Sequence, residues 1–360
     1  MKHVKPVVAR QRSVIWILLG VLAEIMLTAA AVCALYIAWQ MWWTGVQSEH
    51  TQIETRQAVS WSDPGKAENV TIAQAQEGDP PVQPQNAQEG ELIAQVYIPR
   101  FGSQWQRNLV EGTTLTELNK HGLGHYTNSQ MPGQIGNFAF AGHRNGYGQP
   151  LGDVDKLQEG DPIIIRTQDY WYVYHYTKSE IVLPTDVEVV SSNPEEPGAT
   201  PTKRMLTMTT CEPKYSTPTH RWISYGEFSY WAKVSDGIPQ ELATTDTNGK
   251  VKFINNEKAS FASGITTLEP WIFGALAAYV VIFAAATVAW RWPVLAAIHA
   301  GEREKPDFSI YGGLLRLQPI RLLLLLLLLF AAAASTFEWL FPWAASNIPM
   351  LQEMSNYTAV

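Results

Sequence analysis

Residues 205–211 read Met-Leu-Thr-Met-Thr-Thr-Cys, and they carry more information about the architecture than any other stretch of this chain. Large apolar side chains and threonines are interleaved there, which is typical of a β-strand. The run ends in Cys211, so the strand would deliver a thiol to its own end. The other cysteine, Cys33, lies in a long apolar segment, and we expect no disulfide between the two. A lone thiol in this position is a candidate nucleophile.

The residues around this run predict further strands. Short β-forming stretches, separated by glycine and proline, occur at 92–98, 137–142, 162–167, 171–177, 181–183, 187–190, 205–210 and 222–230. One short helix is predicted at 114–119, with Thr113 as its cap. Many short strands at even spacing indicate a barrel or a sandwich and argue against an α/β fold.

Three long apolar segments, at residues 14–43, 271–290 and 322–343, predict membrane-spanning helices. The first is longer than the apolar part of a signal peptide, about 7–15 residues, so we expect an uncleaved anchor. Residues 1–13 hold four basic side chains and no acidic one, and loop 291–321 also has more basic than acidic side chains. Because positive flanks stay in the cytoplasm, we expect residues 44–270 and the tail 344–360 to lie outside the cell.

The predicted outer segment divides by composition. Residues 44–90 are rich in Gln, Glu, Pro and Ala and predict a flexible stalk, residues 91–235 form the folded unit, and residues 236–270 predict a linker. Residues 44–270 contain 27 acidic and 17 basic side chains. This negative balance argues against nucleic acid as a partner.

The chemistry of a thiol nucleophile requires a partner that moves its proton. Candidate partners in the outer segment are His121, His125, His143, His175 and His220. We favour His143, because a predicted strand leads into a glycine-rich loop there, and such a junction exposes a rigidly positioned side chain. Its imidazole could take the thiol proton or protonate a leaving amine. Arg221 follows Cys211 by ten residues, and its guanidinium suits an oxyanion.

The residues alone leave other interpretations open. A buried cysteine is often only a small hydrophobic side chain, and the chain would then be a receptor or scaffold built on a β-barrel. A hydrolytic cysteine protease would use the same Cys–His pair as a transferase. We can assign no aspartate or asparagine as a third, orienting group. No cluster with the spacing of metal ligands is evident, so we predict no metal site.

At this point the motifs resemble those of a known family, the sortases. Residues 206–216, Leu-Thr-Met-Thr-Thr-Cys-Glu-Pro-Lys-Tyr-Ser, with Arg221 downstream, resemble its active-site strand, Thr-Leu-x-Thr-Cys followed by an arginine. Residues 136–144, Gly-Asn-Phe-Ala-Phe-Ala-Gly-His-Arg, resemble its histidine segment. Residues 97–99 and 160–161 match its Ile-Pro strand and Gly-Asp turn, so the resemblance covers roughly residues 92–232.

Two further comparisons concern the subgroup. Residues 124–126 (Gly-His-Tyr), residues 146–148 (Gly-Tyr-Gly) and the run Cys-x-Pro-Lys-Tyr-Ser are similar to class E, the housekeeping type of actinobacteria. The two carboxyl-terminal spans resemble instead those of the pilin-polymerising class C enzymes.

The resemblance implies a fold, a reaction and a set of residues. The fold would be all-β, an eight-stranded barrel, joined to three transmembrane helices. The site residues would be Cys211 as nucleophile, His143 as general acid and base, Arg221 as oxyanion or substrate stabiliser, and Thr210 and Tyr147 in the substrate groove. No cofactor is implied.

The same resemblance implies the partners and the location. The donor would be a surface protein or pilin with a Leu-Pro-x-Thr-Gly or Leu-Ala-x-Thr-Gly sorting signal, cut between Thr and Gly. The acceptor would be the amine of a lipid-linked peptidoglycan precursor or a pilin lysine. The enzyme would be a multi-pass protein of the cell membrane with an extracellular catalytic domain.

Overall fold

A computed structural model describes residues 14–63, 70–83, 85–254, 265–302 and 319–354 of the chain. The tail predicted at 1–13, residues 303–318 of the predicted cytoplasmic loop and the last six residues of the outer tail lie outside this part. The chain forms two compact units. The first comprises Met1–Ala38 and Thr267–Pro342, and the second comprises Trp39–Thr266 and Trp343–Val360.

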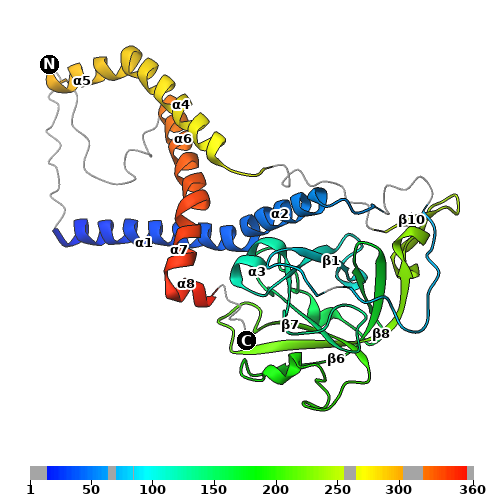
Figure 1. The fold of residues 1–360 in the computed structure, drawn as a ribbon. Helices are drawn as coiled ribbons and strands as arrows, with labels where there is room; N and C mark the ends of the chain where they lie inside the picture. The colour runs from blue at the N-terminus through cyan, green and yellow to red at the C-terminus, as the bar shows by residue number, and fades with distance from the viewer. Residues whose placement is uncertain (1–13, 64–69, 84, 255–264, 303–318, 355–360) are drawn as a thin grey trace. The chain divides into compact units, whose positions relative to one another are not determined.

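Eight strands of the second unit close into a barrel (Figure 1). Around the barrel they are β1 (Leu92–Tyr97), β2 (Gln106–Glu111), β3 (Leu123–His125), β4 (Gly136–Gly142), β7 (Arg204–Glu212), β8 (His220–Lys233), β6 (Tyr170–Val182) and β5 (Pro162–Arg166). Two neighbouring pairs, β2–β3 and β4–β7, are parallel, and the other pairs are antiparallel. The predicted all-β barrel is therefore confirmed.

Alternation along β4 and β7 separates the barrel core from an outer face. Phe138 and Phe140 of β4 belong to the same buried cluster as Leu206 and Met208 of β7. Because successive side chains of a strand point to opposite faces, the intervening residues of both strands point outward. On β7 that outer row ends at Cys211.

A second apolar cluster covers the outside of β5 and β6. Trp171 and Val173 of β6 pack there with Ala73, Ile238 and Phe253. Bridges from Ile72 to Ile238 and from Gln76 to Trp231 tie residues 70–76 to the barrel. The same region contains η6 (Val234–Asp236), η7 (Gln240–Leu242) and the hairpin of β9 (Ala243–Thr245) and β10 (Val251–Phe253).

The structure differs from the flexible stalk predicted over 44–90. Residues Trp39–Trp43 form the π-helical segment η1, and Thr44–Ala58 form helix α2, which packs against α3 (Leu115–His121) and β2. Its buried residues are mainly polar, namely Thr44, Val46, Ser48 and Gln52. The polar composition of residues 44–58 therefore belongs to a helix that packs on the barrel through hydrogen bonds and not through a stripe of apolar side chains.

Local differences concern the segments between strands. Strand β6 runs on to Val182, and the strand predicted at 187–190 is instead the 3-10 turn η5 (Val187–Val190). It follows a tight turn in which the Asp186 carboxylate accepts the backbone N–H of Leu183 at 3.0 Å. Strands β2 and β3 were not predicted. The remaining short turns of the barrel are η3 (Pro99–Phe101) and η4 (Val154–Lys156).

The first unit is helical. It includes α1 (Val14–Ala38), α4 (Glu269–Ala286), η9 (Thr287–Arg291), α5 (Trp292–His299), α6 (Pro319–Ser335) and η11 (Thr336–Leu340); α7 (Phe341–Asn347) and α8 (Pro349–Met354) follow. Three helical stretches, Leu18–Ala58, Glu269–Ala289 and Ile320–Asn347, are long and apolar enough to cross a membrane. The Glu338 carboxylate accepts hydrogen bonds from Thr267 Oγ1 (2.7 Å) and Leu268 N (3.1 Å), where its charge complements the amino terminus of α4.

Candidate active site

Strand register brings three of the predicted site residues into one row. Cys211 on β7 lies directly opposite Arg221 on β8. On the other side of β7, Ala141 of the parallel strand β4 pairs with Thr209. His143 follows the last residue of β4, two residues beyond Ala141, just as Cys211 is two residues beyond Thr209, so alternation gives both side chains the outward face. The barrel therefore places an imidazole, a thiol and a guanidinium at adjacent strand ends, although 78 residues separate the first from the last in sequence.

Thr210, which was predicted to line the substrate groove, lies on the other face of β7. Because side chains alternate along β7, Thr210 points away from the row that contains Thr209 and Cys211. It is fully buried, and its hydroxyl donates to the carbonyl of Gly142 at 2.7 Å. This bond joins the ends of β7 and β4 immediately before Cys211 and His143. Thr209, and not Thr210, contributes to the neighbouring pocket.

The Cys211 thiol is buried, with 6% of the residue exposed. Burial raises the pKa of Cys211 to about 11, against the opposing influence of the guanidinium groups of Arg221 and Arg144. The raised pKa means that the resting group is a neutral thiol at physiological pH. A proton acceptor is then needed to generate the thiolate when a substrate is attacked.

The His143 imidazole is suited to accept that proton. It is 1% exposed, and burial lowers the pKa of His143 to about 4, so the resting ring is neutral. Its Nε2 lies 2.7 Å from Oδ1 of Asn119 on α3. An amide oxygen can only accept, so Nε2 carries the proton and Nδ1 is the basic nitrogen. Asn119 is the orienting third group that the sequence did not identify, because it precedes His143 by 24 residues and two strands, β3 and β4, lie between them.

Tyr147 packs on the imidazole. The two rings are stacked, with centroids 4.9 Å apart and planes inclined by 29°. Tyr147 was predicted to lie in the substrate groove, but it does not line the described pocket. Its backbone φ is 49°, which is uncommon for a residue other than glycine, and its N–H donates to Thr44 Oγ1 at 2.9 Å.

Arg144 links the loop after β4 to the end of β7. Its Nη1 donates to the Cys211 carbonyl at 3.4 Å and pairs with the Glu212 carboxylate. The guanidinium also lies over the Trp222 ring, 4.6 Å from its centroid. A residue adjacent to His143 in sequence therefore contacts both Cys211 and the residue after it. The sequence motifs do not predict this contact, because the contact depends on the parallel pairing of β4 and β7.

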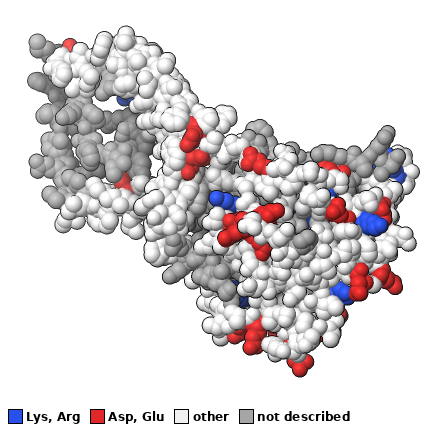
Figure 2. Space-filling view, in the orientation of Figure 1, with Lys and Arg blue, Asp and Glu red and all other residues white. Residues whose placement is uncertain are grey.

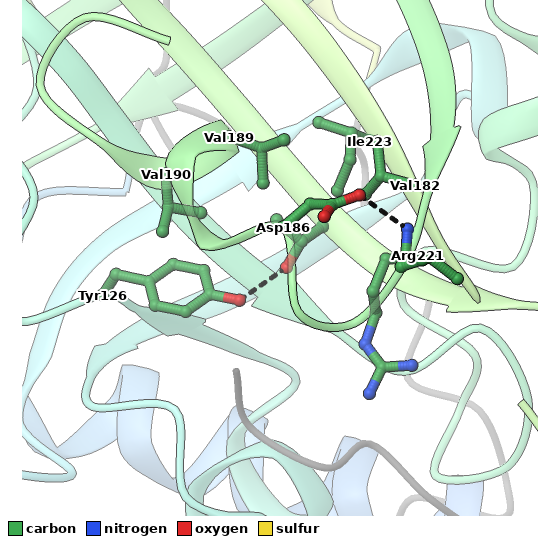
Figure 3. A pocket seen from close by; sticks show the side chains of 9 residues that line it. Tyr126, Val182, Asp186, Val189, Val190, Arg221 and Ile223 are labelled. Atoms are coloured by element: carbon green, nitrogen blue, oxygen red, sulfur yellow. Dashed lines mark hydrogen bonds between the residues drawn. The ribbon is translucent and has the colours of Figure 1, made fainter. Parts of the chain in front are cut away.

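A pocket opens beside the row of three residues (Figure 3). Val189, Val190 and Tyr126 lie along one side of it, whereas Arg221 lies at the other. Most of the remaining lining is apolar and comes from Val182, Leu183 and Ile223, together with Thr209 and Asp186. Because Arg221 and Thr209 belong to the strands that carry the thiol row, the pocket adjoins the candidate nucleophile.

Hydrogen bonds fix the lining of this pocket at two points. The hydroxyls of Tyr126 and Thr209 are 2.8 Å apart, an interaction drawn in Figure 3. The fully buried Asn137 donates through Nδ2 to the carbonyls of Val189 (3.3 Å) and Ser191 (3.0 Å). The pocket is therefore held by side chains of β4 and by the turn η5.

The other candidate histidines have different surroundings. His125 is fully buried on β3, where Nδ1 lies 2.9 Å from Glu111 Oε2 and Nε2 lies 2.9 Å from Ser129 Oγ. This network braces the barrel next to Tyr126. Cys33 and Cys211 are not joined in a disulfide. Within the described residues, no group of three histidine, cysteine, aspartate or glutamate side chains could hold a metal ion.

Comparison with known proteins gives the family. Residues 96–229 match the sortase domain. The sortase SrtE2 of Streptomyces coelicolor is 32% identical over 237 residues, which cover 62% of this chain and 87% of that protein. This chain belongs to the sortase family. It is therefore a cysteine transpeptidase, as its sequence motifs predicted.

Other sortases extend the comparison. SrtE1 of Streptomyces coelicolor is 30% identical over 235 residues, covering 62% of this chain and 60% of that protein. Among solved structures, the SrtA sortase from Actinomyces oris is 38% identical, with a TM-score of 0.45, and covers 47% of this chain and 96% of its own. Sortase E from Streptomyces avermitilis is 40% identical, with a TM-score of 0.39, and the coverage is 43% and 99%. The predicted likeness to class E is confirmed by the curated relatives, while the comparison of the carboxyl-terminal spans with class C stays a prediction.

Proposed function

We propose that this sortase anchors surface proteins to the cell wall, using Cys211 as nucleophile, His143 as general acid and base, and Arg221 to stabilise the oxyanion. The observation that carries the proposal is the row of these three groups beside an apolar pocket. The donor is a protein with a Leu-Pro-x-Thr-Gly or Leu-Ala-x-Thr-Gly signal. Its apolar residues would occupy the pocket, which leaves the Thr–Gly bond at the end where Arg221 lies.

The first half-reaction transfers the acyl group to sulfur. Cys211 Sγ attacks the threonine carbonyl while its proton passes to Nδ1 of His143, and Arg221 faces the developing oxyanion. The C–N bond to glycine then breaks, His143 returns the proton to the departing amine, and a thioester remains on Cys211. The neutral resting pair suits this sequence because the proton moves only when the substrate is in place.

The second half-reaction releases the product. An amine attacks the thioester, His143 takes a proton from it, and Cys211 leaves as a thiol after reprotonation. For wall anchoring, the amine belongs to a lipid-linked peptidoglycan precursor. A pilin lysine would make the enzyme a pilin polymerase, and water would make it a protease.

A membrane location accompanies this role. The three spans and the basic flanks support an enzyme that crosses the membrane several times with its barrel outside the cell. There it would meet both the exported donor and the lipid-linked acceptor. Figure 2 shows more acidic than basic surface on the visible face of the barrel unit, and this negative surface argues against a nucleic-acid partner. Protease protection in membrane vesicles of known orientation tests the placement.

The activity test uses the full chain in detergent or nanodiscs. Labelled pentapeptides of the two signal types are incubated with and without an amine panel of diaminopimelic acid, glycine peptides and a pilin-type lysine peptide. We expect amine-dependent transfer and a thioester intermediate, both absent in Cys211→Ala. Cys33→Ala is the matched control and should retain activity. Transfer that survives in Cys211→Ala, or cleavage that millimolar amine never diverts from water, would contradict the proposal.

A further inference from the structure

Helix α2 contacts the two elements that surround His143. Its buried polar residues Thr44, Ser48 and Gln52 are spaced four apart and therefore share one helix face, here called the docking face. Figure 1 shows α2 beside α3, and both belong to the barrel unit. In sequence, α2 follows directly after the first predicted span, residues 14–43, which η1 completes.

The first contact is with the histidine loop, defined as residues 143–149. Thr44 Oγ1 donates to the carbonyl of Gln40 at 2.7 Å and accepts the N–H of Tyr147 at 2.9 Å. Close packing supports the bond, since a Cβ on Gly45 would lie 3.1 Å from both N and Cα of Gly148. Helix and loop therefore meet backbone to backbone at Gly148, the residue after the tyrosine that stacks on His143.

This loop needs external support. Residues 146, 147, 148 and 149 all have positive φ, at 71°, 49°, 78° and 46°. Two of the four are Tyr147 and Gln149, for which such angles are unfavourable. A backbone of this kind persists only when its surroundings hold it in place. The docking face provides one such constraint, at Tyr147 itself.

The second contact is with α3, which carries Asn119. Ser48 Oγ donates to the carbonyl of Lys120, the next residue, at 3.2 Å. Gln52 Oε1 accepts the N–H of Asn108 on β2 at 3.0 Å and lies against Gly122, where a Cβ would be only 2.8 Å from it. One helix thus supports both the tyrosine that stacks on the imidazole and the helix whose asparagine binds its Nε2.

We propose that the docking face of α2 positions His143 for catalysis, so that the segment following the membrane anchor is part of the catalytic unit. Thr44 acts through Tyr147 and is a positioning residue, because it contacts neither the thiol nor the imidazole in the bonds described. The proposal rests on the proposed role of His143 and adds a requirement for the anchor-side helix. A sortase built this way is fully active only while α2 stays docked.

Thr44→Val tests the proposal in the full chain. Valine has the shape of threonine but cannot accept the Tyr147 N–H, so the loop loses its constraint. We expect kcat to fall about tenfold with KM little changed, because the substrate pocket is untouched. Amide exchange at residue 147 should accelerate by a similar factor, about tenfold.

Two matched variants complete the experiment. Thr55→Val removes the same kind of intrahelical bond, to the carbonyl of Thr51 at 2.8 Å, on the same helix, and should behave as wild type. Thr44→Ser keeps the oxygen that accepts the Tyr147 N–H. It should therefore keep wild-type kcat and the slow amide exchange of the wild type at residue 147. Tm measured for each variant separates a local effect from unfolding.

The outcomes are distinct. Equal kcat in Thr44→Val and Thr55→Val, or equal loss in Thr44→Val and Thr44→Ser, overturns the positioning role. If the wild type transfers no peptide at all, the proposed function is what fails. Amide exchange still tests the contact in that case, and unchanged exchange at residue 147 in Thr44→Val overturns it.

Discussion

Replacing Asn119 by alanine removes the oxygen that accepts the Nε2–H of His143 at 2.7 Å. The imidazole is 1% exposed, so water cannot readily replace the lost partner. A buried donor left without an acceptor costs about 1–3 kcal/mol. If that cost falls on the oriented ring in the transition state, kcat/KM decreases by about 5- to 150-fold. Initial rates of peptide transfer to an amine measure the effect, with the exposed neighbour Lys120→Ala as control.

The isosteric variant Asn119→Asp gives a sharper test, because it changes charge and preserves shape. A carboxylate against Nε2 favours the imidazolium, so the pKa of His143 should rise from about 4 by roughly 1–3 units. Only the neutral ring can accept the thiol proton. The acid limb of the kcat/KM profile should therefore move to higher pH, and activity at pH 5 should fall more than activity at pH 8.

Two results would refute this reasoning. Asn119→Ala could match Lys120→Ala in rate, in which case the hydrogen bond does not orient a catalytic group. Alternatively, the acid limb of Asn119→Asp could coincide with that of the wild type. His143 would then not be the group whose ionisation limits the reaction.

Three further predictions concern the thiol, the fold and the pocket. Alkylation of Cys211 by iodoacetamide at pH 7.5 should be about 300-fold slower in the native protein than after denaturation, because the pKa of Cys211 is about 11 and a typical thiol titrates near 8.5. The alkylation rate of the native protein should still rise above pH 9. A rate that is constant above pH 9 would contradict the raised pKa. Because the pKa of His143 is lowered to about 4 in the folded protein, its contribution to the free energy of unfolding is complete above about pH 6.5 and decreases by about 3 kcal/mol as the pH falls towards 4. The Tm of His143→Gln should therefore fall less than the Tm of the wild type between about pH 6.5 and about pH 4. Asn137→Ala frees the turn that carries Val189 and should raise KM about tenfold with kcat nearly unchanged; an unchanged KM would show that the turn is not part of the substrate site.

The strands that carry the site were recognisable in sequence, for a physical reason. β4 and β7 each bury one face in the barrel, so Phe138, Phe140, Leu206 and Met208 produce a clear period of two. The residues at the ends of these strands, His143 and Arg144 after β4 and Cys211 near the end of β7, belong to the motifs that resemble the sortase family. Short strands such as β3 bury too few residues to produce a pattern, and they were missed.

The supporting groups could not be predicted in the same way. Asn119 reaches His143 from a separate helix, and no spacing rule connects residues 24 apart. The composition of helix α2 predicts a flexible stalk because its docking face is polar, and composition cannot distinguish a polar buried face from a solvated one. The place of Thr210 in the substrate groove stays a prediction; its neighbour Thr209 lines the pocket, and which of the two faces it depends on strand register.

The parallel pairing of β4 with β7 has a consequence for the order of events during folding. Strands β5 and β6 lie between them in sequence, so the contact that unites imidazole and thiol is long-range, and we expect it to form later than the β5–β6 hairpin. β7 also needs β8 on its other side, which brings the arginine. A chain in which this pairing has not yet formed thus keeps the sulfur apart from its proton acceptor, and we expect it to capture no donor before the barrel has closed.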